Sequence, residues 1–322
     1  MKNRWTKGTF FLLFVAGSLF PLKAAAKEAP CLSKKNLTMR AGDTSLITLR
    51  NNGNNLTSWQ VISGQKKVSL SCRISYGELV IQAKKKGKAK IRATVGSKHY
   101  IIKVKVKKAK GARKVVLTKA LRKKAGISTK GQVKVPKTFR YKKKKYKITA
   151  IGSDCFGSCK KMTSIQLPST VTSLASGAFH DCTKLTSVTF SKNLVDIGNS
   201  VFYRCQSLKE AHLPEKLVSM GTGVFESCLS LERVTFEGSL KTLPASTFIY
   251  CKALTEVNLS LDLAYIEKKA FLGCQSLKNL TLPDSLIQVG DQAFDQTSTG
   301  FQWKGTNYKT SQELLEALGN QK

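Results

Sequence analysis

Several residue types are scarce in this chain of 322 residues, and each scarcity narrows the range of functions. Three histidines leave little room for the ligand set of a metalloenzyme. Nine cysteines are too few for a disulfide scaffold at this length. The sequence has no HExxH motif, no glycine-rich phosphate loop and no GxSxG nucleophile elbow. We therefore expect no enzymatic activity, and we assign no catalytic residue, no cofactor and no metal site.

Acidic residues are also few, and their distribution divides the chain. The chain has only 19 Asp and Glu residues compared with 55 Lys and Arg, which gives a formal net charge of +36. Residues 27–150 hold 35 cations and three acids, whereas residues 151–322 hold 16 of each. A large positive charge is typical of proteins that bind polyanions. The first half is therefore expected to attract anionic polymers, and the second half is not.

Long apolar runs are absent except at the N-terminus. The first eight residues include three cations, a mainly apolar stretch continues to Leu22, and alanines occupy 24–26. This order is typical of a secretory signal peptide, here over residues 1–26. An N-terminal membrane anchor is the alternative, although the apolar stretch is short for a bilayer span. We expect a secreted or cell-surface protein without a membrane span after the signal is removed.

The second half of the chain repeats with a period of 23 residues. Phenylalanine recurs at 156, 179, 202, 225, 248, 271 and 294, and cysteine at 159, 182, 205, 228, 251 and 274. Two leucine columns follow the same period, at 185, 208, 231, 254 and 277 and at 194, 217, 240, 263 and 286. Four columns in register indicate a solenoid of about seven coils, because one coil cannot bury its apolar edge alone.

Each repeat unit predicts a short strand, a second extended piece and a compact turn. Residues 185–190 end in the alternation of a strand, and the Ala178–Cys182 segment is too short for an independent helix. The cysteine column has two interpretations. It can be a metal ladder or redox relay, or it can fill a narrow slot between coils, as buried free thiols commonly do. Packing is the favoured interpretation.

The repeat unit resembles a known family. Its pattern, L-x-x-I-x-L-P-x-x-L-x-x-I-G-x-x-A-F-x-x-C-x-x-L, looks like the BspA-like (Treponema-type) leucine-rich repeat of bacterial surface proteins, and residues 277–294 (LKNLTLPDSLIQVGDQAF) show most of it. The resemblance covers about residues 148–299. It departs from the pattern at Cys155, Val201, Thr247 and Thr297. The resemblance implies a strand ladder on the concave face of the solenoid and a role in adhesion.

The region before the repeats predicts short strands separated by Gly, Asn and Ser clusters. The strands are expected at 46–49, 58–61, 79–81, 89–93 and 101–106. Spacing of this kind favours an all-β sandwich. The Leu37-x-Met39-x-x-Gly42 segment, Trp59 and the Gly87–Ile91 segment are similar to bacterial immunoglobulin-like (BIG) domains. The predicted organisation is a signal peptide (1–26), an Ig-like sandwich (27–108), a basic connector with a solenoid-capping hairpin (109–147), repeats (148–299) and a C-terminal cap with a short helix (300–322).

Two clusters of cations are candidates for polyanion binding. Alternation along two neighbouring strands places Lys88, Lys90, Arg92, Lys103, Lys105 and Lys107 on one outer surface. A solvated face that only keeps the protein soluble is the alternative. Lys142, Lys143, Lys144 and Lys145 form a run that is interpreted as a charged hairpin tip. Cys31 and Cys72 lie outside the repeats and are a possible disulfide in a secreted protein.

Two hypotheses for function follow from these features. In the first, the solenoid binds an extracellular protein or glycan through outward-facing ladder positions, and the basic module associates with the envelope. These positions are Gln166, Thr189, His212, Arg233, Thr235, Asn258 and Thr281. In the second, the protein binds wall polymer, acidic polysaccharide or extracellular DNA, and the repeats are a spacer. The expected partners are an extracellular ligand and an anionic envelope or host polymer, with no sequence-specific nucleic acid.

Overall fold

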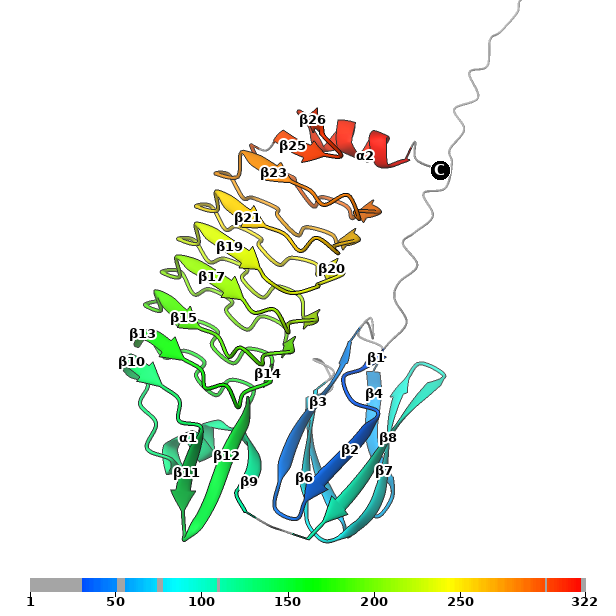
Figure 1. Ribbon diagram of the computed structural model, residues 1–322, viewed down its shortest axis with the longest axis vertical. Coiled ribbons are helices and arrows are strands. Elements are labelled where there is room, and N and C mark those ends of the chain that lie inside the picture. Colours follow the sequence, from blue (N-terminus) through cyan, green and yellow to red (C-terminus); the bar gives the residue numbers. More distant parts are fainter. Residues whose placement is uncertain (1–30, 51–55, 74–77, 109–110, 299, 320–322) are drawn as a thin grey trace, which may run out of the picture.

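The chain folds into a strand-rich N-terminal module followed by a long stack of coils (Figure 1). The computed structural model describes residues 31–50, 56–73, 78–108, 111–298 and 300–319. The predicted signal peptide lies outside these residues. Figure 1 shows the N-terminal strands beside the first coils, with the helix α2 (Ser311–Gly319) at the opposite end of the stack.

The N-terminal module consists of two four-stranded sheets. One has the order β1 (Cys31–Leu32), β3 (Thr44–Arg50), β6 (Glu78–Ala83) and β5 (Val68–Arg73). The other has the order β2 (Asn36–Arg40), β8 (Lys98–Lys107), β7 (Gly87–Val95) and β4 (Leu56–Ser63). Alternating side chains of both sheets share one apolar core around Ile47, Ile81, Ile91 and Trp59. The five strands predicted from the sequence lie within β3, β4, β6, β7 and β8.

The connector joins the module to the coils through strands and one short helix. Its elements are β9 (Arg113–Leu117), α1 (Lys119–Lys124), β10 (Lys130–Lys134), β11 (Thr138–Tyr141) and β12 (Lys144–Ile151). β11 and β12 form the antiparallel hairpin expected ahead of the repeats. β12 also pairs with β9 on one side and with the first repeat on the other. The predicted boundary between residues 147 and 148 therefore falls inside β12, a strand shared by connector and solenoid.

Two columns of parallel strands run along the coils. The first column contains β13 (Lys161–Gln166), β15 (Ser187–Thr189), β17 (Glu210–Leu213), β19 (Arg233–Phe236), β21 (Glu256–Asn258) and β23 (Asn279–Thr281). The second contains β14 (Ser173–Leu174), β16 (Asp196–Ile197), β18 (Ser219–Met220), β20 (Thr242–Leu243), β22 (Tyr265–Ile266) and β24 (Gln288–Val289). Paired residues in neighbouring coils are 23 apart, as in Ile197 and Met220. The sequence period is thus the length of one coil.

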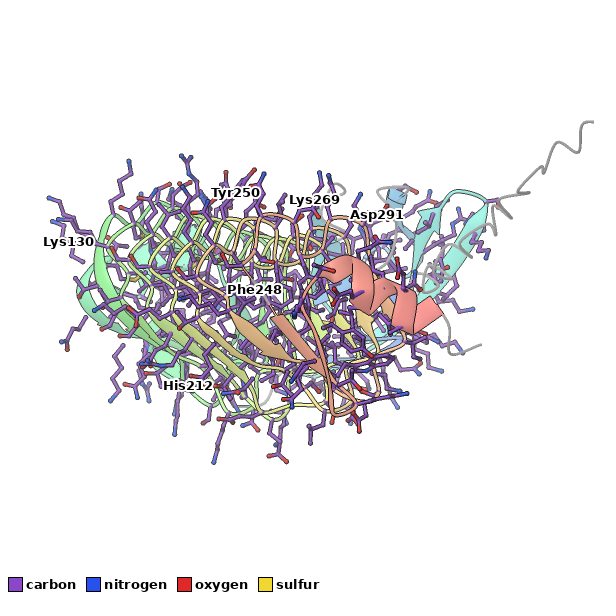
Figure 2. All side chains as sticks on the ribbon, turned by 90° about the horizontal axis from the view of Figure 1, so that it is seen from above. Lys130, His212, Phe248, Tyr250, Lys269 and Asp291 are labelled. Atoms are coloured by element: carbon purple, nitrogen blue, oxygen red, sulfur yellow. The ribbon has the colours of Figure 1, made fainter. Side chains whose placement is uncertain are left out.

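A column of phenylalanine rings forms the centre of the solenoid. The rings from Phe156 to Phe294 stack face to face, with 5.3–5.7 Å between successive centroids. Figure 2 shows Phe248 inside the stack, between His212 on one face and Tyr250 on the opposite face. The segments that carry the rings are turns, as the sequence predicted. Gly198 permits close stacking, because a Cβ there would lie 2.4 Å from the Ser176 nitrogen.

Both ends of the phenylalanine column are covered. At the first coil the buried Arg122 of α1 lies 5.1 Å from the centre of the Phe156 ring and donates to the Cys155 carbonyl oxygen. At the last coil β25 (Gly300–Trp303) extends the ladder, and β26 (Thr306–Tyr308) pairs with it. Thr310 Oγ1 then accepts the Glu313 amide at 3.2 Å and caps α2. Terminal coils need such covers, since their apolar edges otherwise face water.

Candidate binding surfaces

The outward side chains of the first strand column form a polar row, here called the ladder face, whose strands pair in three separate groups along the stack. Strand pairing places His212 beside Thr235 and Thr235 beside Asn258. Gln166 pairs with Thr189 in the earlier coils in the same way. The seven predicted positions are exposed, apart from the half-buried Thr235: Gln166, Thr189, His212, Arg233, Thr235, Asn258 and Thr281. The structure thus brings these residues together on one side of the solenoid.

Glu210 lies close to two other polar side chains of the ladder face. Glu210 Oε2 lies 3.7 Å from His212 Nε2 and 3.6 Å from the Arg233 guanidinium. All three side chains are about half exposed, so water and salt screen these pairs and each contributes at most about 1 kcal/mol to stability. Their positions are therefore available to a ligand at little cost to folding.

The β7–β8 hairpin presents the second predicted surface, here called the cationic sheet face. Strand register places Lys88 opposite Lys105 and Lys90 opposite Lys103. Like charges that face each other in this way cost up to about 1 kcal/mol per pair. Five of the six predicted cations are exposed, and Arg92 is half-buried and donates to Gln60 Oε1 at 2.8 Å. The surface is a dense array of lysines, and an anionic ligand would relieve their repulsion.

The lysine run at 142–145 lies where the sequence placed it, at a hairpin tip. Lys142 and Lys143 both have positive φ and form the two-residue turn, and Lys144 and Lys145 begin β12. The Lys142 and Lys124 ammonium groups lie 5.8 and 5.5 Å from the centre of the Tyr141 ring. The tip is exposed and belongs to the connector, so it is separate in sequence from the cationic sheet face on β7 and β8.

Acidic side chains join the module to the connector and to the first coils, a role that counting charges did not reveal. Asp43 accepts the Lys114 amide at 2.8 Å, and Glu78 accepts the Ser153 hydroxyl at 2.7 Å and the Ser176 amide. Both carboxylates are almost fully buried, at 3% and 2% exposure. They are the only acids among the described residues from 31 to 150. The exposed charge of this half is consequently all positive over the part that the structure describes.

The cysteine column lies in the core and makes regular hydrogen bonds. The thiols of Cys182, Cys205, Cys228, Cys251 and Cys274 each donate to the phenylalanine carbonyl of the preceding coil, at 3.1–3.2 Å. Burial raises the pKa of Cys274 to about 12 and that of Cys228 well above its ordinary value. A raised pKa disfavours the thiolate, which is the form that binds metals and reacts. No cluster of metal-ligating side chains occurs in the described ranges. The geometry supports packing.

These thiols are expected to resist alkylation while the protein is folded. Iodoacetamide at mildly alkaline pH should leave Cys205, Cys228 and Cys251 unlabelled in the native protein and should label all three in denaturant, because burial keeps them protonated and inaccessible. Mass spectrometry of tryptic peptides measures the label at each position. Fast labelling of native Cys228 would contradict the packing interpretation.

The predicted pairing of Cys31 with Cys72 does not fit the sheet. Cys31 is in β1 and Cys72 in β5, the two edge strands of one sheet, with β3 and β6 between them. Three strand spacings separate their backbones by about 14 Å. A disulfide needs Cα atoms within about 7 Å. The two edges would have to leave the sheet before such a bond formed.

The coils, the strand ladder and the phenylalanine column together define a leucine-rich repeat protein. The chain matches the family model described as BspA type Leucine rich repeat region, in six copies over residues 139–255 and 241–302. This match spans half of the chain, which therefore belongs to that family. The family model matches six copies of the repeat, while the phenylalanine column contains seven rings. No helix in the part of the chain that the structure describes is long and apolar enough to cross a bilayer.

Solved structures of bacterial leucine-rich repeat proteins are similar to the chain. A leucine rich cell surface protein from Faecalibacterium prausnitzii is 26% identical with a TM-score of 0.48, covering 57% of this chain and 52% of that one. A leucine-rich repeat protein from Bacteroides ovatus is 30% identical with a TM-score of 0.42, covering 52% and 50%. The chain thus spans about half the length of these two proteins. No protein with a curated description matches.

Proposed function

We propose that this protein is a secreted or cell-surface, non-catalytic binding protein that recognises a protein or glycan through the ladder face. The observation that carries this proposal is the row of mostly exposed polar side chains, which strand pairing aligns within groups of coils, on a repeat region with equal numbers of cations and acids. Parallel strands 23 residues apart repeat this surface along the stack, so an extended ligand meets similar groups at each coil. The signal peptide and the immunoglobulin-like nature of the N-terminal sheets belong to this proposal.

The basic module is proposed to attach the protein to an anionic polymer of the envelope or of a host. Burial of Asp43 and Glu78 favours this role, because it leaves exposed cations unopposed across the described part of the module. Lysines on the cationic sheet face suit diffuse electrostatic attraction better than bidentate recognition. The second candidate function, polyanion binding with the repeats as a spacer, rests on the same observation.

Ladder-face recognition is tested with the double variant His212→Ala/Arg233→Ala on a glycan and extracellular-matrix protein array. Ligands bound by the native chain at about 0.5 M salt, where exposed electrostatics are screened, should lose at least about tenfold in affinity. The two residues are exposed, so the variant should melt within a few degrees of the native protein.

The matched control is Arg204→Ala on the opposite, turn-bearing side of the coils. Arg204 is 53% exposed and lies 3.9 Å from Asp181, which resembles the setting of Arg233. Affinity should not change in this control. The contrary outcome has two parts: every bound ligand dissociates at about 0.5 M salt, and the ladder-face variant does not change the affinity for any of them at lower salt. In that case the repeats are a spacer and the second candidate function holds.

A further inference from the structure

A groove lies where the N-terminal module meets the first coils. Residues of β2 and β3 line one side, and the turns before β14 and β16 line the other, with β9 and β12 between them. Its volume is about 750 Å³, and a neighbouring hollow of about 510 Å³ shares five lining residues with it. The two hollows therefore form one groove, here called the joint groove, of a size typical of ligand sites.

Cations from both halves of the protein line the joint groove. The module supplies Lys34, Arg40 and Lys107, the connector supplies Lys114 and Lys147, and the repeats supply Lys216. The only acid among the lining residues is Asp43, which is 3% exposed and already accepts the amides of Arg40 and Lys114. The groove therefore presents positive charge to solvent from walls contributed by distant parts of the sequence.

Two of these ammonium groups have neutral oxygens as hydrogen-bond acceptors. Lys34 Nζ donates to the Leu46 carbonyl at 3.4 Å, and Lys216 Nζ donates to Asn193 Oδ1 at 2.8 Å. Burial lowers the pKa of Lys34 below its ordinary value, the Asp196 carboxylate counteracts part of this effect, and the Lys114 charge adds to it. An anion in the groove would stabilise the charged form of Lys34, which the protein alone stabilises incompletely.

The other lining groups suit a sugar better than a nucleic-acid base. The lining residues include hydroxyl and amide side chains on both sides, such as Thr38, Ser169, Thr170, Thr172 and Asn193. None of the lining residues is aromatic, whereas single-stranded nucleic acids are usually held by bases stacked on aromatic rings. Hydroxyl and amide groups can exchange hydrogen bonds with the hydroxyls of a sugar ring.

The groove also connects to the cationic sheet face. Arg40 pairs with Lys107 and Thr38 pairs with Lys105, which places the groove at the edge of that face. A polymer chain leaving the groove along β2 therefore meets the lysine rows of β8 and β7. We infer that the joint groove binds a segment of an acidic polysaccharide, with its carboxylate or sulfate groups at the lysines and its hydroxyls at the threonine, serine and asparagine side chains. This inference rests on the polyanion-binding part of the proposed function and assigns it a specific site.

The experiment uses the full chain and short probes that fit the groove. Binding of a sulfated hexasaccharide, a carboxylated oligogalacturonate and a neutral cello-oligosaccharide is measured by calorimetry at physiological salt. The native protein should bind at least one acidic probe and not the neutral one. Lys147→Gln/Lys216→Gln should weaken that binding at least about tenfold, since each substitution removes a charge-assisted contact.

Two matched double variants remove the same charge elsewhere. Lys88→Gln/Lys90→Gln on the cationic sheet face should change the affinity for the short probes less than about threefold. The same variant should lower the affinity for long acidic polymers, because only a long chain reaches both surfaces. Lys252→Gln/Lys268→Gln on distant coils should change neither. If Lys147→Gln/Lys216→Gln does not fold, the single variant Lys216→Glu replaces it in the same binding experiment, because Lys216 is exposed.

Each contrary outcome has a distinct meaning. If the groove variants do not change the affinity for the acidic probes but the sheet-face variant lowers it, the groove site is overturned and the polyanion-binding role stands. A native protein that binds no short probe would overturn the groove, and failure with long acidic polymers as well would also overturn the polyanion role. Tighter, groove-dependent binding of a single-stranded oligonucleotide would overturn the assignment to a sugar.

Discussion

Replacing Phe225 with alanine is expected to lower the free energy of unfolding by about 3–5 kcal/mol, the usual cost of deleting a buried aromatic ring. Phe225 is fully buried, and its ring centroid lies 5.5 Å from that of Phe202 and 5.7 Å from that of Phe248. The substitution leaves a cavity that the flanking coils cannot close, because strand pairing on both sides fixes their separation. Urea denaturation followed by circular dichroism measures the change.

Two controls separate ring loss from general damage. Phe225→Leu keeps much of the volume and should cost less than half as much as alanine. Thr235→Ala, on the ladder face of the next coil, should stay within about 0.5 kcal/mol of the native protein. A loss below about 1 kcal/mol for Phe225→Ala would show that the phenylalanine column is not the main source of the solenoid's stability.

Replacing Glu78 with alanine is expected to cost about 3 kcal/mol and to loosen the module from the coils. The substitution removes two charge-assisted hydrogen bonds, from the Ser153 hydroxyl and the Ser176 amide, and such bonds contribute about 1.5–3 kcal/mol each. It also leaves the Ser176 amide buried without an acceptor. Denaturant unfolding gives the energy, and faster tryptic cleavage between β8 and β9 reports the loosening.

The isosteric variant Glu78→Gln should fall between alanine and the native protein, because its amide oxygen still accepts one bond. Glu237→Ala, on an exposed position of the repeats, should have little effect. Unchanged cleavage and stability in Glu78→Ala would mean that the apolar contacts of Leu46, Val116, Ala150 and Ala175 hold the joint alone.

The repeat region could be predicted in detail because its signal is periodic. Most coils place the same residue type at the same position, so the phenylalanine column, the buried thiols and the outward ladder positions all follow from one unit. Five strands of the module were found for a similar reason, since their apolar residues alternate or form short runs. β1, β2 and β5 were missed: β1 is only two residues long, whereas β2 and β5 do show alternating apolar residues that the sequence analysis did not assign to strands.

The joint between the halves could not be predicted, because its residues are far apart in the chain and have no shared pattern. Glu78 and Ser176 are 98 positions apart, and Thr48 donates to Asp196 over 148 positions. Arg122 was missed for another reason: in a run of cations it looks like any solvated charge, yet it lies over the first ring of the column. The joint groove depends on this docking, and so it is visible only in three dimensions.

The equivalence of the coils has a consequence for how the protein can vary. Beyond the first coils, which also contact the N-terminal module, each coil packs on its two neighbours and adds one strand spacing of about 4.8 Å to the stack. Gain or loss of a 23-residue unit from the middle of the stack would change the span between the joint groove and the C-terminal helix, while both ends kept their covers and their chemistry. Duplication of repeat units would therefore change the distance between the C-terminal end and the anionic polymer to which the basic module is proposed to attach.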